Sequence, residues 1–441
     1  MTAVMARPAP IARSSAGPQA AEAPYAVVHL VAQESGKPLI GPQVLDHMQW
    51  QAVAPGANSP RRVVVGLIEA ARVATSPATG RRARELQKRA PGVRVAVLPY
   101  VSRFSAAANA PFLAARLKQL IGDLPVVFHC RGESAVEWAV ALRPSFARGG
   151  IVADIRGPWP EELLFARGFD GPARADPRSL RDYHVNLGRL HDGLAHAGAV
   201  ISVSAGMLDW LEGLGVGRDR MAYVPCCVPR VTYTSVARER TRTRLALGTK
   251  LVFTYLGIVT RYQHVQGGVV PFMREAARQL GDDVHLLVLT PDVAAVRGML
   301  EEGGVTARHY TALHVPQDEV AEHLAAGDAG LLLRESSRLT RVVQPVKLGE
   351  YLAAGLPVVV SRGAGTVDSL VEDAGAGVVV ALEGQACDDV PGEVSRTCAI
   401  LREQGDRMRD AALALCERDF LWSRYTNVVR DAYRHALAWQ S

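Results

Sequence analysis

Aromatic residues and long apolar runs are both scarce in this sequence. Phe, Trp and Tyr together make up 6% of the 441 residues. A protein that binds single-stranded nucleic acid normally combines a basic groove with aromatic stacking platforms, so we expect no nucleic-acid partner. No apolar run approaches the roughly 18 residues that a membrane-spanning helix needs.

The sequence also lacks a strong charge of either sign. Its 50 basic and 44 acidic side chains leave a net charge of +6, and the pI is near 9.1. Hydrophobic residues make up 48% and charged residues 21%, which is ordinary for a globular protein and excludes a wholly disordered chain. The small basic excess suits an anionic small ligand or an anionic membrane surface, and by itself requires neither.

Motifs for metals and for common enzyme classes are missing. The six cysteines show no CxxC pair and no zinc-type Cys/His spacing, and no DxD, HExxH, GxSxG or Walker motif occurs. We therefore expect no metal site and no cofactor, and we interpret the adjacent Cys226 and Cys227 as small buried residues in a reducing cytoplasm. Residues 1–24 lack the apolar region of a signal peptide, which favours a disordered tail over an organelle transit peptide.

Short apolar runs recur along the chain, separated by stretches with helical spacing. Fully apolar runs that alternate with helices are typical of parallel sheets covered on both faces. A polar, Arg-rich stretch at 230–249 divides the runs into two series. The first series comprises 26–31, 62–68, 93–98, 125–130, 151–157, 199–204 and 221–225; the second comprises 251–257, 284–290, 308–313, 329–335, 357–361 and 377–381.

The two series predict an α/β protein with two doubly wound Rossmann-like domains and a cleft between them. We place the first domain at 25–228 and the second at 229–419. In such sheets ligands bind beyond the carboxyl ends of the strands, so we expect the functional residues in the loops there.

The chain after 377 has a different pattern, because two helices and no further strand are expected there. The helices are predicted at 391–418 and 420–439. Large side chains in the second helix recur at helical spacing and predict a buried stripe rather than an aromatic ligand site: Trp422, Tyr425, Val428, Val429 and Tyr433.

The segment from Pro345 to Pro357 combines helix signals with charged groups. Pro345 suits the first turn of a helix, and Gly355 and Pro357 can end it. The free N–H groups at the start of such a helix carry partial positive charge and bind phosphate readily. Lys347 adds a positive charge in that turn, and one turn later the Glu350 carboxylate can accept hydrogen bonds from the two hydroxyls of a ribose.

Small residues follow the next predicted strand and open another helix. Gly363 and Gly365 lie in this turn. Because glycine has no Cβ, both positions would let the backbone approach a ligand closely.

With these residues the sequence resembles the retaining glycosyltransferases of family 4, which have the GT-B fold. Their signature is a Glu-x7-Glu motif followed by a Gly-x-Pro-Val-Val run, and residues 345–359 (PVKLGEYLAAGLPVV) are similar to the branch that reads P-x-K-x-x-E-Y-L-A-x-G-x-P-V. The second Glu falls on Glu350, which in the family holds the ribose. The first falls on Val342, so the carboxylate that touches the donor sugar is absent; the candidates to replace it are Glu335, Arg338 and Arg341.

The resemblance implies roles for further residues of the second domain. The helix start with Lys347, Leu348 and Gly349 would hold the donor diphosphate, together with Arg261 in the loop after 251–257. At this loop the family's usual Lys-Gly is replaced by Gln266-Gly267. The resemblance also implies that residues 420–441 pack back on the first domain.

Ionisable residues also gather at two predicted strand ends of the first domain. His129 and Arg131 end one run, and Asp154, Arg156 and Glu162 follow the next. Because buried Asp and Arg without partners are costly, we expect a paired network that faces a ligand. An ion pair between Asp154 and Arg156 that serves only the structure is the alternative.

The resemblance places this group on the acceptor side of the protein. His129 lies where many relatives have a His near the reacting sugar, and the alternative is a hydrogen-bonded core residue. Similar Arg-Gly-x-x-x-Glu-Glu segments face the cleft in this branch. Gly41, which ends the Gly-containing loop 36–41 after the first run, is a further candidate for an acceptor contact.

The resemblance, together with these residues, implies a metal-independent transferase that moves a sugar from a nucleotide-diphosphate sugar to a hydroxyl of a glycan or lipid-linked acceptor. We expect a role in cell-surface polysaccharide or glycolipid synthesis, in the cytoplasm and in peripheral contact with the inner membrane face. Two alternatives are a nucleotide-sugar 2-epimerase on the same fold and a non-catalytic nucleotide-sugar-binding scaffold of a glycan-assembly complex. The missing first Glu motivates the scaffold alternative.

Overall fold

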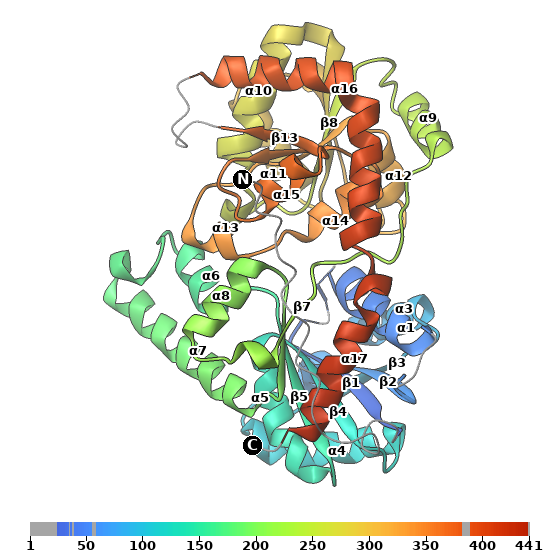
Figure 1. The fold of residues 1–441 in the computed structure, drawn as a ribbon, viewed down its shortest axis with the longest axis vertical. Helices are drawn as coiled ribbons and strands as arrows, with labels where there is room; N and C mark the ends of the chain where they lie inside the picture. The colour runs from blue at the N-terminus through green and yellow to red at the C-terminus, as the bar shows by residue number, and fades with distance from the viewer. Residues whose placement is uncertain (1–23, 35, 38, 55–58, 382–388, 440–441) are drawn as a thin grey trace. The chain divides into compact units, whose positions relative to one another are not determined.

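The computed structural model describes residues 24–34, 36–37, 39–54, 59–381 and 389–439. The predicted tail at 1–24 lies outside the described residues except for Pro24. The chain divides into two compact units (Figure 1). The first extends to Leu164 and adds Ala175–Pro229 and the chain from Trp422 onward, and the second consists of Phe165–Arg174 and Arg230–Leu421.

The first unit contains a parallel sheet of seven strands among its described residues, in the order β3-β2-β1-β4-β5-β6-β7. The order reverses between β1 and β4, which are paired so that His29 lies opposite His129. The strands are β1 Ala26–Ala32, β2 Arg62–Ala70, β3 Arg94–Tyr100, β4 Val126–Arg131, β5 Gly149–Ile155, β6 Ala199–Ser202 and β7 Met221–Tyr223.

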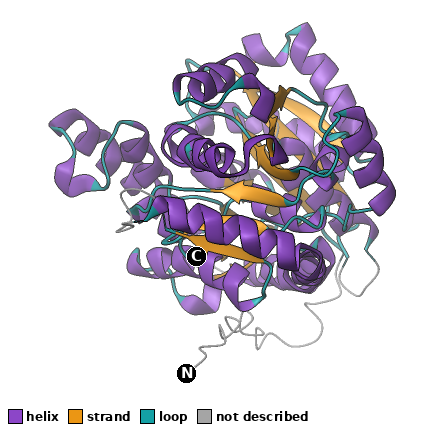
Figure 2. Cartoon of the chain, turned by 90° about the horizontal axis from the view of Figure 1, so that it is seen from above, coloured by secondary structure: helices purple, strands orange, loops and turns teal. Residues whose placement is uncertain are grey.

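Helices flank this sheet (Figure 1), and helices surround the strands in the view coloured by secondary structure (Figure 2). Serine and aspartate side chains start several of them; Ser204, for example, accepts a 3.0 Å hydrogen bond from the Met207 N–H at the start of the helix Ala205–Gly213. The helices are α1 Asp46–Val53, α2 Ala71–Ala74, α3 Pro77–Arg89, α4 Ala106–Ile121, α5 Gly132–Leu142, α6 Trp159–Ala166, α7 Pro177–His196, α8 Ala205–Gly213 and α17 Trp422–Ala438.

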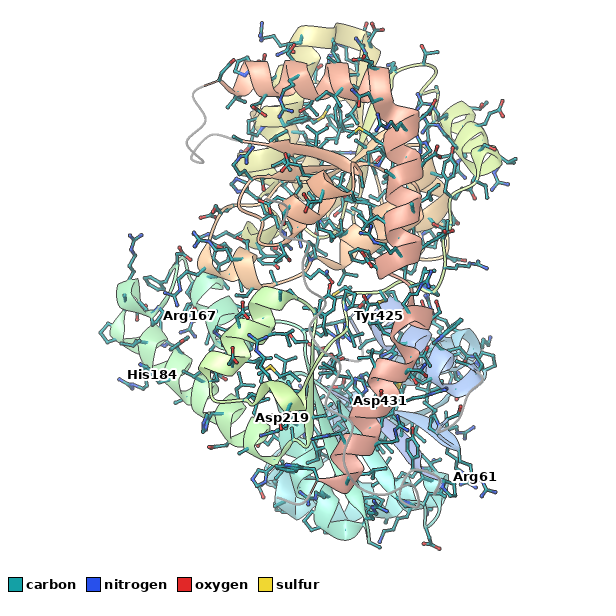
Figure 3. The ribbon with its side chains drawn as sticks, viewed as in Figure 1. Arg61, Arg167, His184, Asp219, Tyr425 and Asp431 are labelled. Carbon is teal, nitrogen blue, oxygen red and sulfur yellow. The ribbon has the colours of Figure 1, made fainter. Side chains whose placement is uncertain are left out.

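Two glycines allow the last helix, α17, to lie directly on the sheet of the first unit. A Cβ on Gly150 would come within 2.6 Å of the Ala436 backbone, and one on Gly198 within 2.8 Å. Trp422 and Tyr433 are buried in the core, and Tyr425 packs its ring edge-on against Tyr223 at 6.1 Å (Figure 3). The predicted buried stripe and the predicted return of this helix to the first domain are both confirmed.

The second unit repeats the architecture with six described strands in the order β10-β9-β8-β11-β12-β13. Its strands are β8 Leu251–Leu256, β9 Val284–Leu289, β10 Tyr310–Leu313, β11 Ala329–Leu332, β12 Val358–Ser361 and β13 Gly377–Val380. Its helices are α9 Ser235–Arg244, α10 Val270–Leu280, α11 Val293–Glu302, α12 Val320–Ala325, α13 Arg338–Val342, α14 Val346–Ala353, α15 Val367–Asp373 and α16 Val390–Asp419.

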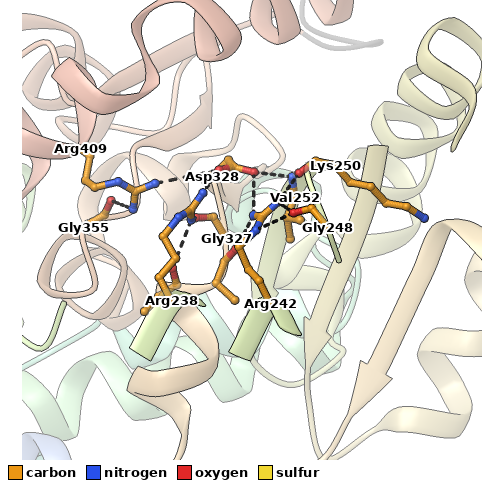
Figure 4. Close-up of polar contacts among 11 residues, drawn as sticks. Arg238, Arg242, Gly248, Lys250, Val252, Gly327, Asp328, Gly355 and Arg409 are labelled. Atoms are coloured by element: carbon orange, nitrogen blue, oxygen red, sulfur yellow. Dashed lines mark hydrogen bonds and ion pairs between the residues drawn. The ribbon is translucent and has the colours of Figure 1, made fainter. Parts of the chain in front are cut away.

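Asp328 organises the amino-terminal end of this second sheet (Figure 4). It accepts a 2.7 Å hydrogen bond from the Val252 N–H and pairs with Arg238 and, at 3.3 Å, with Arg242. The same two guanidiniums bind the backbone carbonyls that end α12, where the helix dipole is negative. The cations at this end of the sheet therefore stabilise the packing of α9 and α12 on the strands.

All thirteen predicted apolar runs contain a strand, and both predicted C-terminal helices are present. The strands are shorter than the runs at some ends; Ala307–His309, for example, forms a 3-10 turn before β10. Among the described helices, none combines the length and the hydropathy that a bilayer crossing requires. The prediction of two Rossmann-like domains is confirmed.

Candidate functional site

The strand order places the candidate site of the second unit at the carboxyl ends of β8 and β11. These neighbouring strands mark the point where the order of the sheet reverses, which is where doubly wound sheets bind ligands. The loop after β8 carries Gly257 and Arg261, the loop after β11 carries Arg334 and Glu335, and α14 follows.

Lys347 is buried at the start of α14, with 7% of its surface exposed. Its Nζ atom lies 4.2 Å from the centroid of the Tyr255 ring, a cation–π distance. Burial lowers the pKa of Lys347 well below its usual value; the nearby Arg334 lowers it further and Glu350 opposes the shift. Gly257 takes a positive φ of 134°, and a Cβ there would lie 3.4 Å from Nζ. The loop after β8 therefore leaves room beside the amine.

Arg334 is a second buried cation at this place, with 3% of its surface exposed. Its guanidinium carbon lies 4.1 Å from the centroid of the Tyr262 ring. The Ser361 hydroxyl holds the backbone of Arg334 by accepting from its N–H at 2.7 Å and donating to its carbonyl at 2.8 Å. Two cations, each stacked on a tyrosine, are thus fixed close enough for one to shift the pKa of the other.

Arg261 lies at the edge of this group and is more exposed than Lys347 or Arg334. Its Nη1 donates to the Phe165 carbonyl at 3.1 Å, and its guanidinium lies 4.6 Å from the Phe165 ring centroid. Its Nη2 is 3.6 Å from a carboxylate oxygen of Glu335. Arg261, which we predicted to bind phosphate, therefore lies close to Glu335, one of the predicted substitutes for the missing Glu.

The helix α14 begins at Val346, and Pro345 is its N-cap rather than a first-turn residue. Leu348 is fully buried and its N–H donates to the Pro345 carbonyl at 3.1 Å, so it has no group left for the predicted donor contact. Gly349 is also buried, and Glu350 is half-buried. Of the predicted donor-binding residues in this turn, Lys347 and Glu350 have the side chains suited to the role.

Gly363 and Gly365 both have positive φ, as expected for the turn after β12. A Cβ on Gly363 would come within 2.8 Å of the Ser336 hydroxyl, and one on Gly365 within 2.8 Å of the Arg341 carbonyl. Contacts within the protein therefore explain these two glycines, without the close approach to a ligand that we predicted from the sequence.

A buried network occupies the corresponding region of the first unit. The Nε2 atom of His129 lies 3.2 Å from Asp154, and the Arg156 Nε atom lies 2.6 Å from the other carboxylate oxygen. Nδ1 of His129 is 2.9 Å from the Tyr433 hydroxyl. Burial opposes the charge on Asp154, but Arg156 and His129 together hold the pKa of this carboxyl below its usual value.

His129 has no exposed surface, and two further histidines surround it. The His29 ring stacks on it at 4.4 Å, and the His47 ring stands edge-on at 5.4 Å. Burial lowers the pKa of His29 and of His47, and His129 lowers both further. His129 is therefore a hydrogen-bonded core residue, which is the alternative that we gave to a contact with the reacting sugar.

Arg131, Glu133 and Glu162 lie at the carboxyl end of this network. The Arg131 Nε atom is 3.6 Å from Glu34, and burial lowers its pKa. A Cβ on Gly157 would come within 2.2 Å of a Glu162 carboxylate oxygen, so Glu162 folds back over that glycine. Burial, reinforced by Glu162, raises the pKa of Glu133 to about 7. Glu133 is thus the group suited to proton transfer near neutral pH.

Gly41 does not face an open site. It begins a π-helical turn, Gly41–Leu45, and a Cβ on it would lie 3.2 Å from the Arg89 guanidinium. Arg89 in turn pairs with Asp46 at 2.7 Å. The space above Gly41 is therefore filled by Arg89, which corrects the predicted acceptor contact.

One group of described residues has a geometry that could hold a metal ion. Ligand atoms of His29, His129 and Asp154 lie within 4.8 Å of one another. The same carboxylate binds Arg156, so a cation there would face a guanidinium at close range. The charges around Asp154 therefore disfavour a metal ion at this group.

Several residues of both groups carried no signal that we recognised in the sequence. Arg334 lies at the end of the predicted strand 329–335, so its place at a strand end was available as a clue. The tyrosines under the cations and the two extra histidines had no such clue, because each lies far along the chain from its partner: Tyr255, Tyr262, His29 and His47.

Comparisons with known proteins agree with this architecture. Residues 306–386 match the family model described as Glucosyltransferase 3-like, C-terminal domain. A search of curated protein sequences found no match. The matched segment contains α13, α14 and β12, and therefore Lys347 and Glu350.

Solved glycosyltransferase structures resemble nearly the whole chain. HepE of Anabaena in complex with UDP is 14% identical with a TM-score of 0.63, covering 92% of this chain and 98% of its own. Sucrose-phosphate synthase of Thermosynechococcus elongatus is 16% identical with a TM-score of 0.66, covering 94% and 99%. A glycosyltransferase of Rickettsia africae is 13% identical with a TM-score of 0.65, with the same coverage. Membership of family 4 stays a prediction, but the chain has the two-domain GT-B fold of these glycosyltransferases.

Proposed function

We propose that this protein is a glycosyltransferase that moves a sugar from a nucleotide-diphosphate sugar to an acceptor hydroxyl. The observation that carries the proposal is the pair of buried cations, Lys347 and Arg334, at the carboxyl ends of β8 and β11. HepE, which shares the fold, has been solved with UDP and with UDP-glucose. A diphosphate is the ligand whose charge best matches two such cations.

The donor would bind to the second unit, with its ribose at Glu350 and its diphosphate at the cations. Breaking the bond between the sugar and the diphosphate leaves negative charge on the leaving group. Lys347, Arg334 and Arg261 would stabilise that charge together with the N–H groups that start α14. Because side chains and backbone dipoles supply this charge, we expect transfer without a metal ion.

The first unit would present the acceptor. Glu133 supports this assignment, since a carboxyl with a pKa of about 7 can take a proton from a hydroxyl near neutral pH. We expect a glycan or lipid-linked acceptor and retention of the anomeric configuration, as the resemblance to family 4 implies.

Binding measurements test the donor part of the proposal. Isothermal titration with UDP, GDP and uridine should show a nucleoside diphosphate bound more tightly than the nucleoside. If no nucleoside diphosphate or its sugar binds, the proposal fails. Incubation with a bound nucleotide sugar alone then separates transfer from isomerisation of the donor by a 2-epimerase.

A scaffold that binds a nucleotide sugar without turnover is a second candidate. Val342, at the end of α13, replaces the carboxylate that touches the donor sugar in family 4. Hydrolysis or transfer of a bound donor that is lost in Lys347→Met would favour the enzyme, and tight binding with no turnover on any acceptor would favour the scaffold.

A further inference from the structure

The outer face of α4 in the first unit exposes apolar side chains. Phe112 has 77% of its surface exposed, more than any other large hydrophobic residue of the described chain. The loop before the helix exposes Phe104 at 49% and Val101 at 41%. Apolar groups gathered on one surface mark an interaction site more often than a single exposed residue does.

Hydrogen bonds from Asn109 hold this loop on the helix. Its side-chain nitrogen donates to the carbonyls of Val101 and Phe104, each at 3.2 Å, and its oxygen accepts from the Val101 N–H at 2.8 Å. Phe112 lies one turn beyond Asn109 on the same helix. The exposed side chains are thus a fixed feature of one surface.

Basic residues surround these apolar groups, and the loop and helix that carry them contain no acidic residue before Asp123. Residues 101–122 contain no Asp or Glu. At about 100° per residue, Arg116 and Lys118 lie on opposite edges of the exposed helix face, with Ala108 and Ala115 between them. Two further arginines border the surface: Arg103, beside Phe104, and Arg62, which donates to the Leu120 carbonyl at 2.7 Å.

We propose that this α4 face docks on an anionic lipid bilayer. We define the face by Val101, Phe104, Phe112, Arg103, Arg116 and Lys118. A helix that lies in the bilayer interface inserts an apolar strip and keeps basic side chains at its edges. Lys and Arg can bury their stems while their charges reach the lipid phosphates, and each contributes through attraction to an anionic surface. The small alanines between them allow close approach.

Charge argues against two other occupants of the face. A second copy of the chain would bring the same basic residues against each other, which is unfavourable at close range. Residues 1–23 of the chain carry Arg7 and Arg13 against one acidic residue, Glu22, so they have the same sign as the face. An anionic surface is the complementary partner.

Flotation with lipid vesicles tests the proposal on the full chain, without nucleotide. Vesicles of phosphatidylcholine with added phosphatidylglycerol should carry the protein upward, and vesicles of phosphatidylcholine alone should not. Raising the salt concentration should weaken the binding, because the charges involved are exposed. Because no donor is present, failure here leaves the proposed transferase activity untouched.

Variants locate the binding surface. Phe112→Ser should reduce the partition onto anionic vesicles roughly tenfold or more, because it removes the largest inserted side chain. The double variant Arg116→Glu, Lys118→Glu should reduce it to a similar extent through charge. The matched control is Val236→Ser on α9, whose side chain is 71% exposed and lies in the other unit. It should bind as the original chain does.

Three outcomes would overturn the proposal. The first is a wild-type chain that does not bind anionic vesicles. The second is equal binding by the α4 variants and the original chain, or equal loss in Val236→Ser. The third is self-association of the wild type in solution, measured by light scattering, that Phe112→Ser abolishes; in that case the face would belong to a second copy.

Discussion

The Nζ atom of Lys347 lies 4.2 Å above the Tyr255 ring, and the neighbouring Arg334 lowers the pKa of this buried amine. An aromatic face stabilises a cation only in part. The folded protein binds this proton less well than the unfolded chain does, and an anion at the site would favour the protonated amine. The charge state of Lys347 is therefore linked both to stability and to ligand binding.

We expect proton uptake when UDP binds, at a pH above the lowered pKa of Lys347. The diphosphate favours the charged amine, so its pKa rises in the complex. Titrations at one pH in buffers of different ionisation enthalpy measure the number of protons taken up. Uptake should vanish in Lys347→Met; equal uptake in that variant would assign the proton to another group.

The same substitution should stabilise the ligand-free protein. Between the lowered pKa and about 10.4, the unfolded chain binds more protons at Lys347 than the folded protein does, so stability should increase with pH there. Lys347→Met removes this pH dependence and should raise the free energy of unfolding at neutral pH by about 1–3 kcal/mol. Thermal melts from pH 7 upward compare the two chains. A melting temperature that falls in the variant at every pH would contradict this account.

Arg334→Gln should weaken UDP binding roughly tenfold or more, since a charged hydrogen bond to a phosphate is lost. Uridine affinity should stay unchanged, because the nucleoside lacks the diphosphate. Isothermal titration with both ligands gives the ratio of the two affinities. The control is Arg297→Gln, an exposed arginine on α11 in the same unit. Equal loss of UDP and uridine binding in Arg334→Gln would indicate a purely structural role.

Glu350→Gln should reduce discrimination between UDP and its 2′-deoxy analogue. The carboxylate accepts from ribose hydroxyls in the proposed complex, so the variant should lose roughly tenfold in UDP affinity and little in affinity for the deoxy form. The control is Glu372→Gln on the exposed side of α15. Unchanged discrimination in Glu350→Gln would place the ribose elsewhere.

Asp154→Asn should destabilise the first unit by about 3–5 kcal/mol, because Arg156 would remain buried without its counter-charge. The pKa of Asp154 lies below its unfolded value, so the ion pair contributes fully above about pH 4 and its contribution falls as the pH drops below that. Urea denaturation followed by tryptophan fluorescence at pH 7 and pH 3 measures both effects. A variant as stable as the original at pH 7 would show that Asp154 is available for another role.

Local patterns predicted the elements of this fold well. Each apolar run became a strand because parallel strands buried on both faces must be apolar along their whole length, and that requirement is visible in the chain. Lys347 and Glu350 were recognisable because helix start and stop signals frame them. The surroundings of Gly41 and His129 were not predictable in this way, because Arg89 and Tyr433, which cover them, come from distant parts of the chain.

The sequence alone determined two similar α/β units and the helix that carries the site. Its hydrophobic periodicity, its capping residues and the segment 345–359 were enough to predict them. The tertiary structure decided which charges are buried and what each one contacts. His129 meets Tyr433 across 304 positions of sequence, and Arg334 meets Tyr262 only because β11 lies beside β8. The free energy of a charge depends on the groups packed around it, and packing between distant segments is a property of the whole fold.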